Sequence, residues 1–156
     1  MAIRRVKGLV WAAIRDGAPE FPKRRPRGTK AEGLRYQKLV GKALPRDAQE
    51  GFWFEFEDRN GYGVCQPDFL LPIPAKGAWA IIECKRTDCR DARVQLLELY
   101  LPVVGLALET PCMGVIVAKY TSAITDPGSI AANLDEVLSR ADGRLPVVNW
   151  LGNGPI

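Results

Sequence analysis

The sequence predicts an α/β domain in which helices flank a mixed central sheet. Residues 78 to 86 ("AWAIIECKR") and 112 to 120 ("CMGVIVAKY") are apolar runs of strand length, typical of strands buried in a sheet. The predicted order of elements is helix, three strands, helix, strand and helix, which indicates mixed α/β architecture. The 156 residues suffice for one compact core. We expect a basic N-terminal segment over residues 1 to 28 and a single domain over residues 29 to 156.

The first predicted helix begins at Thr29, which can cap it, and Pro45 ends it. The aromatic run 51 to 58 ("GFWFEFED") reads as a strand, followed by a turn at "RNGYG". Residues 62 to 72 read as the returning strand, in which Pro67 indicates a bulge or a strand edge.

The second half of the chain alternates helices and strands. Residues 91 to 108 predict a mostly apolar helix that is kinked or broken around Pro102. After the strand at 112 to 120, residues 129 to 142 predict an amphipathic helix. The tail from residue 144 onward predicts a short edge strand.

Composition excludes several classes of site. The chain has no histidine, which rules out Ser-His-Asp and Cys-His nucleophiles and histidine-bound metals. Its four cysteines lack paired zinc-ligand spacing, so we expect reduced thiols. No apolar run approaches the roughly 20 residues that cross a membrane. We therefore expect a cytoplasmic protein without membrane contacts.

Positive charge is concentrated near the N-terminus. Residues 1 to 46 hold thirteen Lys or Arg against three acids, whereas the rest of the chain is net acidic. The run "KRRPRGTK" (23 to 30) is either a solvated loop or an arm that neutralises nucleic-acid phosphates. The candidate phosphate contacts in it are Lys23, Arg24, Arg25, Arg27 and Lys30.

A buried strand that carries Glu83 and Lys85 needs an explanation. The two side chains share a face, roughly 6.6 Å apart along the strand, whereas Cys84 faces the other way with Ile82. A strand end that turns polar is one explanation. The other involves Asp68 on the preceding strand, because two adjacent carboxylates repel unless a hard cation such as Mg²⁺ or Mn²⁺ lies between them.

The motifs "PDFLLP" (67 to 72) and "ECK" (83 to 85) resemble those of the PD-(D/E)XK nuclease superfamily, which has the restriction-endonuclease-like fold. The resemblance covers residues 32 to about 120, and the predicted element order matches the αβββαβ core of that superfamily. It implies a Mg²⁺-dependent (or Mn²⁺-dependent) deoxyribonuclease that hydrolyses DNA phosphodiester bonds.

The resemblance also implies roles for individual residues. Asp68, Glu83 and the backbone carbonyl of Cys84 would hold the metal ion. Lys85 would position the attacking water. Glu32, the single acid in the first predicted helix, matches an additional ligand found in many members; alternatively, it only favours the helix N-terminus.

Members related to recombination exonucleases carry a Gln and then a Tyr on the helix after the Glu-x-Lys strand. "VQLLELY" offers Gln95 as an active-site residue, and Tyr100 is expected to pack in the core. Arg86 would bind phosphate next to the scissile bond. For Arg90 and Arg93 a role in surface charge balance is favoured over phosphate binding, and Lys119 is a further candidate contact.

The same motifs resemble phage resolvase-type endonucleases, which cut branched DNA as dimers, although this chain has a longer Asp-to-Glu interval and no histidine. A catalytically inactive nucleic-acid-binding module on the same fold is the main alternative function. A structural ion pair of Lys85 in an unrelated α/β protein is a third. Exonuclease or endonuclease action, RNA as the substrate, and assembly as a homodimer or in a larger nuclease complex all stay open.

Overall fold

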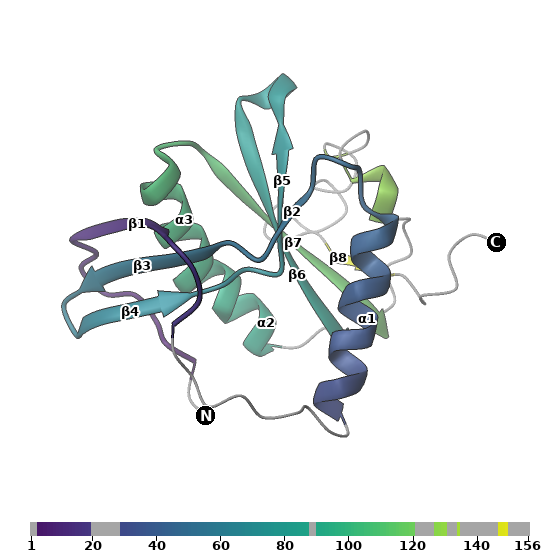
Figure 1. The fold of residues 1–156 in the computed structure, drawn as a ribbon, viewed down its shortest axis with the longest axis horizontal. Coiled ribbons are helices and arrows are strands. Elements are labelled where there is room, and N and C mark those ends of the chain that lie inside the picture. Colours follow the sequence, from purple (N-terminus) through teal and green to yellow (C-terminus); the bar gives the residue numbers. More distant parts are fainter. Residues whose placement is uncertain are drawn as a thin grey trace.

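The computed structural model describes residues 3–19, 29–87, 90–120, 127–130, 134 and 147–149. These residues form a mixed α/β fold with two sheets (Figure 1). The first sheet is antiparallel, in the order β1 (Trp11–Arg15), β3 (Trp53–Asp58) and β4 (Gly61–Cys65). The second has the order β2 (Gln49–Glu50), β5 (Phe69–Ile73), β6 (Ala78–Thr87), β7 (Cys112–Tyr120) and β8 (Val147–Asn149).

The second sheet is mixed, as the sequence predicts. The β2–β5 and β5–β6 pairs are antiparallel, whereas the β6–β7 and β7–β8 pairs are parallel. A parallel pair needs a long crossover, and the helical segment 90–108 provides it between β6 and β7. β8 is the short edge strand that the tail predicts.

Helices cover both faces of this sheet. α1 (Thr29–Ala43) packs on one face, where Tyr36 and Val40 join a core with Ile82 of β6. The segment 90–108 packs on the other face, in a core that includes Ile81. Successive side chains of a strand point to opposite faces, so the apolar run of β6 contributes to both cores.

The crossover is helical throughout but irregular. It consists of α2 (Arg90–Gln95), a π-helical turn (Leu96–Tyr100) and α3 (Leu101–Leu108). The sequence predicts a break around Pro102, and the irregular turn lies just before it. Pro102 itself occupies the first turn of α3, where a missing N–H costs least.

The prediction of one strand over residues 62 to 72 is wrong. The chain leaves the first sheet after Cys65 and enters the second at Phe69, so the segment forms β4 and β5 of different sheets. Pro67 lies in the gap, and its missing N–H cannot continue a hydrogen-bonded ladder. 3₁₀ turns occur at Pro74–Lys76 and Pro127–Ser129.

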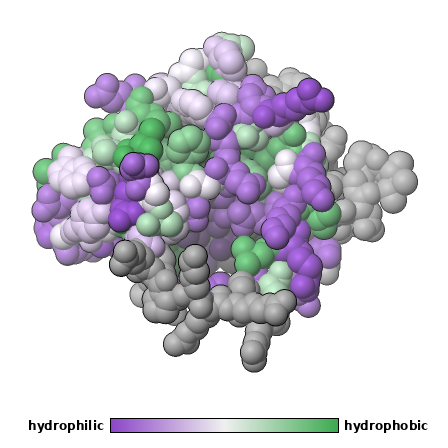
Figure 2. Space-filling model, viewed as in Figure 1, coloured by the Kyte–Doolittle hydropathy of each residue, from purple (hydrophilic) through white to green (hydrophobic). Residues whose placement is uncertain are grey.

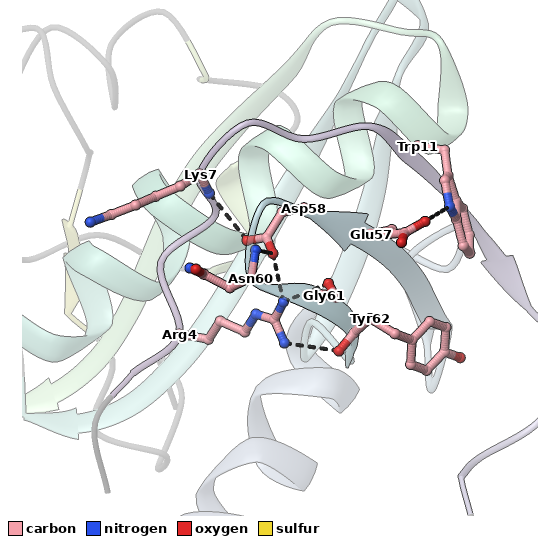
Figure 3. Close-up of polar contacts among 8 residues, drawn as sticks. All are labelled: Arg4, Lys7, Trp11, Glu57, Asp58, Asn60, Gly61 and Tyr62. Carbon is pink, nitrogen blue, oxygen red and sulfur yellow. Dashed lines mark hydrogen bonds and ion pairs between the residues drawn. The ribbon is translucent and has the colours of Figure 1, made fainter.

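Strand β1 was not predicted, and a polar cluster fixes the segment that leads into it (Figure 3). Arg4 Nη2 and the Lys7 and Asn60 backbone N–H groups donate to the Asp58 carboxylate over 2.7, 3.1 and 2.9 Å. Burial acts to raise the pKa of Asp58, but these hydrogen bonds and the Arg4 charge together lower it below its usual value. On β1, Trp11 Nε1 donates to Glu57 over 2.9 Å.

Most of the helix predicted over residues 129 to 142 lies outside the described residues. Within that range the structure describes the end of the 3₁₀ turn and the buried residues Ile130 and Leu134, which join the core beneath α1. Cys65, Cys84 and Cys112 are free thiols. Among the described elements, no helix has the length and apolar character needed to span a membrane.

Candidate active site

The register of β5 and β6 brings Asp68 and Glu83 together. Phe69 pairs with Ile82 in this antiparallel ladder, so the residue before Phe69 and the residue after Ile82 lie opposite each other. The Cys84 backbone N–H donates to Asp68 Oδ2 over 2.7 Å, which fixes the Asp68 side chain against β6. The juxtaposition expected from the sequence is therefore present.

Glu83 is a buried acid with incomplete hydrogen bonding. The residue is 3% exposed, and its Oε2 atom has no hydrogen-bond partner among the residues that the structure describes. Its other oxygen, Oε1, lies 3.2 Å from Lys85 Nζ, whose side chain remains about one-third exposed. Burying a carboxylate oxygen without a hydrogen-bond partner lowers the stability of the fold. A cation or a hydrogen-bond donor that binds at this oxygen would offset that cost.

Burial raises the pKa of both acids, and neighbouring carboxylates add to each shift. Burial, and then the charge of Asp68, raise the pKa of Glu83 to about 8, although Lys85 opposes the shift. Burial also raises the pKa of Asp68 to about 6, against the Cys84 hydrogen bond and the Lys85 charge. At neutral pH without a cation, the pair therefore retains about one proton, which is typical of two carboxyl groups that share a site.

A pocket of about 400 Å³ opens onto this pair. Asp68, Glu83, Cys84 and Lys85 line it from the sheet, and α1 lines the opposite wall with Lys30, Gly33, Leu34 and Gln37. Gly33 and Leu34 lie three and four residues after Lys30, and Gln37 lies seven residues after it, which places all four on one helical face. Figure 2 shows that the side of the molecule formed by α1 is mainly hydrophilic.

Gln95 and Tyr100 lie behind the carboxylates. Gln95 Nε2 donates to the Tyr100 hydroxyl over 2.8 Å, and that hydroxyl donates to the Gln66 carbonyl over 3.3 Å. The wider π turn brings residues five apart toward the same side of the helix, which explains the first contact. Tyr100 is 5% exposed, as predicted for a core residue. Its pKa is raised by burial and then by the charges of Glu83 and Asp68.

The other predicted site residues are placed as follows. Lys30 lines the pocket, whereas Glu32 is exposed on α1 and is not among the pocket-lining residues. Cys84 packs against the core beneath α1, on the side of Ile82. Arg86 belongs to β6, but its side chain lies outside the described residues, as do Lys23, Arg24, Arg25 and Arg27. Arg90, Arg93 and Lys119 do not line the pocket.

Two residues that sequence reasoning missed lie at the site. Gln37 lines the pocket seven residues after Lys30, a spacing that would have placed both on one helical face. Glu50 of β2 pairs with Phe69, and its charge contributes to the raised pKa of Asp68. A two-residue strand has no periodic signal, so nothing in the sequence pattern indicates this third acid.

The donor set fits a hard cation with few protein ligands. Among the described residues, no group of three or more Asp, Glu or Cys side chains is arranged to hold a metal ion. Mg²⁺, however, keeps several waters and is often bound by one or two carboxylates plus substrate phosphate oxygens. Asp68 and Glu83 match that description, and the unpartnered Oε2 of Glu83 would gain an electrostatic partner.

Comparisons of the chain with protein-family models, with curated proteins and with solved structures gave no match.

Proposed function

We propose that this protein is a metal-dependent nuclease that hydrolyses DNA phosphodiester bonds, either nonspecifically or by recognising DNA structure. The observation that carries the proposal is the buried Glu83 with its unpartnered oxygen, next to Asp68 and Lys85 at the wall of an open pocket. A buried carboxyl group without full hydrogen-bond compensation destabilises a fold, whether it is protonated or charged. Such a cost is typical of groups that act on a ligand.

The order of elements supports a restriction-endonuclease-like core. α1, the strands β2, β5 and β6 of the second sheet, the crossover helix and β7 occur in the order αβββαβ, with β3 and β4 inserted between β2 and β5. The separate three-stranded sheet, formed by β1, β3 and β4, is an addition to that arrangement. The finer fold assignment is part of the proposal.

Asp68 and Glu83 would hold Mg²⁺ or Mn²⁺, together with the Cys84 carbonyl and water, and Glu50 is close enough to act on Asp68 electrostatically. A bound divalent ion supplies Lewis acidity and an acidified water. Lys85 presents a positive charge at the pocket, where it can orient a water and stabilise negative charge that grows on the phosphate. Gln95 would act indirectly, because its hydrogen bond to the Tyr100 hydroxyl would hold Tyr100 in position behind Asp68 and Glu83.

Lys30 and Gln37 form the α1 side of the pocket and are suited to binding phosphate oxygens of the strand being cut. The basic run that begins at Lys23 would extend that contact along the DNA backbone. Such contacts read no sequence, which favours nonspecific or structure-selective cleavage.

The test is cleavage of labelled linear, nicked, single-stranded and four-way-branched DNA with Mg²⁺ or Mn²⁺, alongside EDTA. Lys85→Ala should abolish cutting, and Lys76→Ala, an exposed lysine at the other end of the sheet, should leave it unchanged. Thermal melting supplies a second readout. Mg²⁺ should raise the melting temperature of the wild type and not that of Glu83→Gln.

Salt-sensitive DNA binding without cutting by the wild type, and without a Mg²⁺-dependent shift in melting, would favour the inactive binding module instead. A loss of stability in Asp68→Asn would favour a structural ion pair, because a nuclease site relieved of carboxylate repulsion should become more stable.

A further inference from the structure

A second pocket, of about 520 Å³, lies on the first sheet, outside the carboxylate site. One wall is the chain that leaves β1, and the other is the chain that enters β3, with Phe52 and Trp53. Arg15 and Trp53 are paired across these two strands. The volume falls within the range of about 300 to 1,000 Å³ common to small-ligand pockets.

The backbone keeps this pocket open. Gly17 and Gly51, one on each wall, have φ values of 80° and 83°, a conformation that strains other residues. A side chain at Gly17 would point into open space, since no atom lies within 4 Å of the position of its Cβ. Arg15 Nη1 donates to the Gly17 carbonyl over 2.6 Å, which fixes the turn.

The lining chemistry matches a nucleobase better than a phosphate. Phe52 is 37% exposed, so its ring offers aromatic surface for stacking. Arg15 adds a guanidinium plane, which also stacks on bases. Asp16 would repel a phosphate, but its carboxylate can accept a hydrogen bond from an exocyclic amino group.

The pocket is joined to the carboxylate site through β2. Glu50, which acts on Asp68, is followed directly by Gly51 and Phe52. Two residues span at most about 7 Å of chain, roughly the rise of two stacked nucleotides. A Cβ at Gly51 would lie 4.0 Å from Gln66 Nε2, and Gln66 is two residues before Asp68.

We infer that this aromatic pocket binds an unpaired base of the nucleic-acid strand whose phosphate lies at Asp68 and Glu83. The substrate class is therefore DNA with single-stranded or unstacked nucleotides next to the scissile bond, because a base that stays paired and stacked in a duplex cannot place its face against the Phe52 ring. The inference rests on the nucleic-acid substrate of the proposed function, but not on cleavage.

The test is binding in EDTA, where hydrolysis is blocked, measured by fluorescence anisotropy. The probes are a labelled twelve-nucleotide deoxycytidine strand, whose bases carry an exocyclic amino group, and a blunt duplex of the same length, with deoxycytidine monophosphate as competitor. Phe52→Leu should weaken single-strand binding about tenfold, within the range for loss of one stacked base, and leave duplex binding unchanged. Phe52→Trp should restore single-strand binding. Tyr62→Leu, a 56% exposed aromatic on β4, is the matched control and should change neither.

Equal weakening for both probes, or no weakening, would overturn the inference, and so would monophosphate binding as tight as strand binding, which would indicate a free-nucleotide site. Cleavage results separate the two proposals. A chain that cuts DNA while Phe52→Leu binds normally refutes the base pocket alone. A chain that never cuts, but loses single-strand binding in Phe52→Leu, refutes the nuclease alone.

Discussion

The buried carboxyl group of Glu83 makes the stability of the metal-free protein depend on pH. Its pKa rises from an ordinary value of 4.5 to about 8 on folding, and that of Asp68 rises from 3.8 to about 6. Between about pH 4 and pH 6 the unfolded chain has released both protons and the folded chain still binds them, and from about pH 6 to pH 8 the folded chain still binds the Glu83 proton. Raising the pH through this window therefore favours the unfolded state.

We expect metal-free wild-type protein to melt at a higher temperature at pH 5.5 than at pH 8, because folded Glu83 cannot release its proton without charging a buried site. Glu83→Gln should reduce this difference and raise the melting temperature at pH 8. Asp91→Asn removes an exposed carboxylate of α2 and should keep the wild-type difference. Melting curves in EDTA at the two pH values measure it. Identical pH dependence in Glu83→Gln would show that Glu83 does not titrate in this window.

At the scale of elements, α1 forms one wall of the pocket that contains Asp68 and Glu83. The distance of α1 from the sheet depends on Gly41. A Cβ at Gly41 would lie 2.9 Å from Cζ and 3.0 Å from Cε1 of Phe69, which is 2% exposed on β5. Gly33 lies on the same helix and has no atom within 4 Å of its Cβ position. Alanine substitutions at the two glycines therefore distinguish the effect of core packing on stability from the effect of helix propensity.

We expect Gly41→Ala to lower the free energy of unfolding by about 1–3 kcal/mol, the usual cost of overpacking a core. Gly33→Ala should instead raise it by up to about 1 kcal/mol, because alanine favours helix where space is open. Urea denaturation of both variants measures the difference. Equal stability of the two would mean that α1 does not approach Phe69 as closely as the structure has it.

The attachment of the N-terminal segment to the β3–β4 hairpin also depends on Asp58. Asp58 accepts hydrogen bonds from Arg4 and from the backbone of Lys7 (Figure 3). We expect Asp58→Ala to release this segment, seen as faster tryptic cleavage after Arg4, Arg5 and Lys7. Asn60→Ala keeps the backbone N–H that reaches Asp58 and should be cut at the wild-type rate. Unchanged cleavage in Asp58→Ala would mean that other contacts hold the segment.

At the scale of the whole molecule, exposed positive charge continues along α1 away from the pocket. Arg35, Lys38 and Lys42 are exposed there, and the helix carries a single acid, Glu32. A stripe of cations beside the proposed cleavage site would neutralise phosphates of a strand that extends beyond the pocket.

We expect Lys38→Ala with Lys42→Ala to weaken DNA binding and to reduce the slope of log affinity against log salt by up to about 2. The charge-matched control is Arg59→Ala with Lys76→Ala, two exposed cations away from α1, which should leave the slope unchanged. Anisotropy titrations between 50 and 200 mM salt measure it. Equal losses of DNA affinity in both double variants would indicate that the overall positive potential of the molecule attracts DNA, and that the DNA strand does not follow α1.

The sequence alone determined the parts of this protein that depend on local pattern. The period of its apolar residues predicts α1, β6 and β7, and the isolated polar groups Asp68, Glu83 and Lys85 stand out against buried strands. Antiparallel neighbours then bring the two acids together, since opposite residues share a face. The function of this cluster remains a proposal.

Only the tertiary structure decided the long-range pairings. It separated β4 from β5 into two sheets, paired β1 with β3, and brought Glu50 and one face of α1 to the carboxylates. It also formed the second pocket, from Arg15 on one strand and Phe52 and Trp53 on another. These contacts join residues far apart in the chain, and neither propensity nor periodicity records which edge a short strand pairs with.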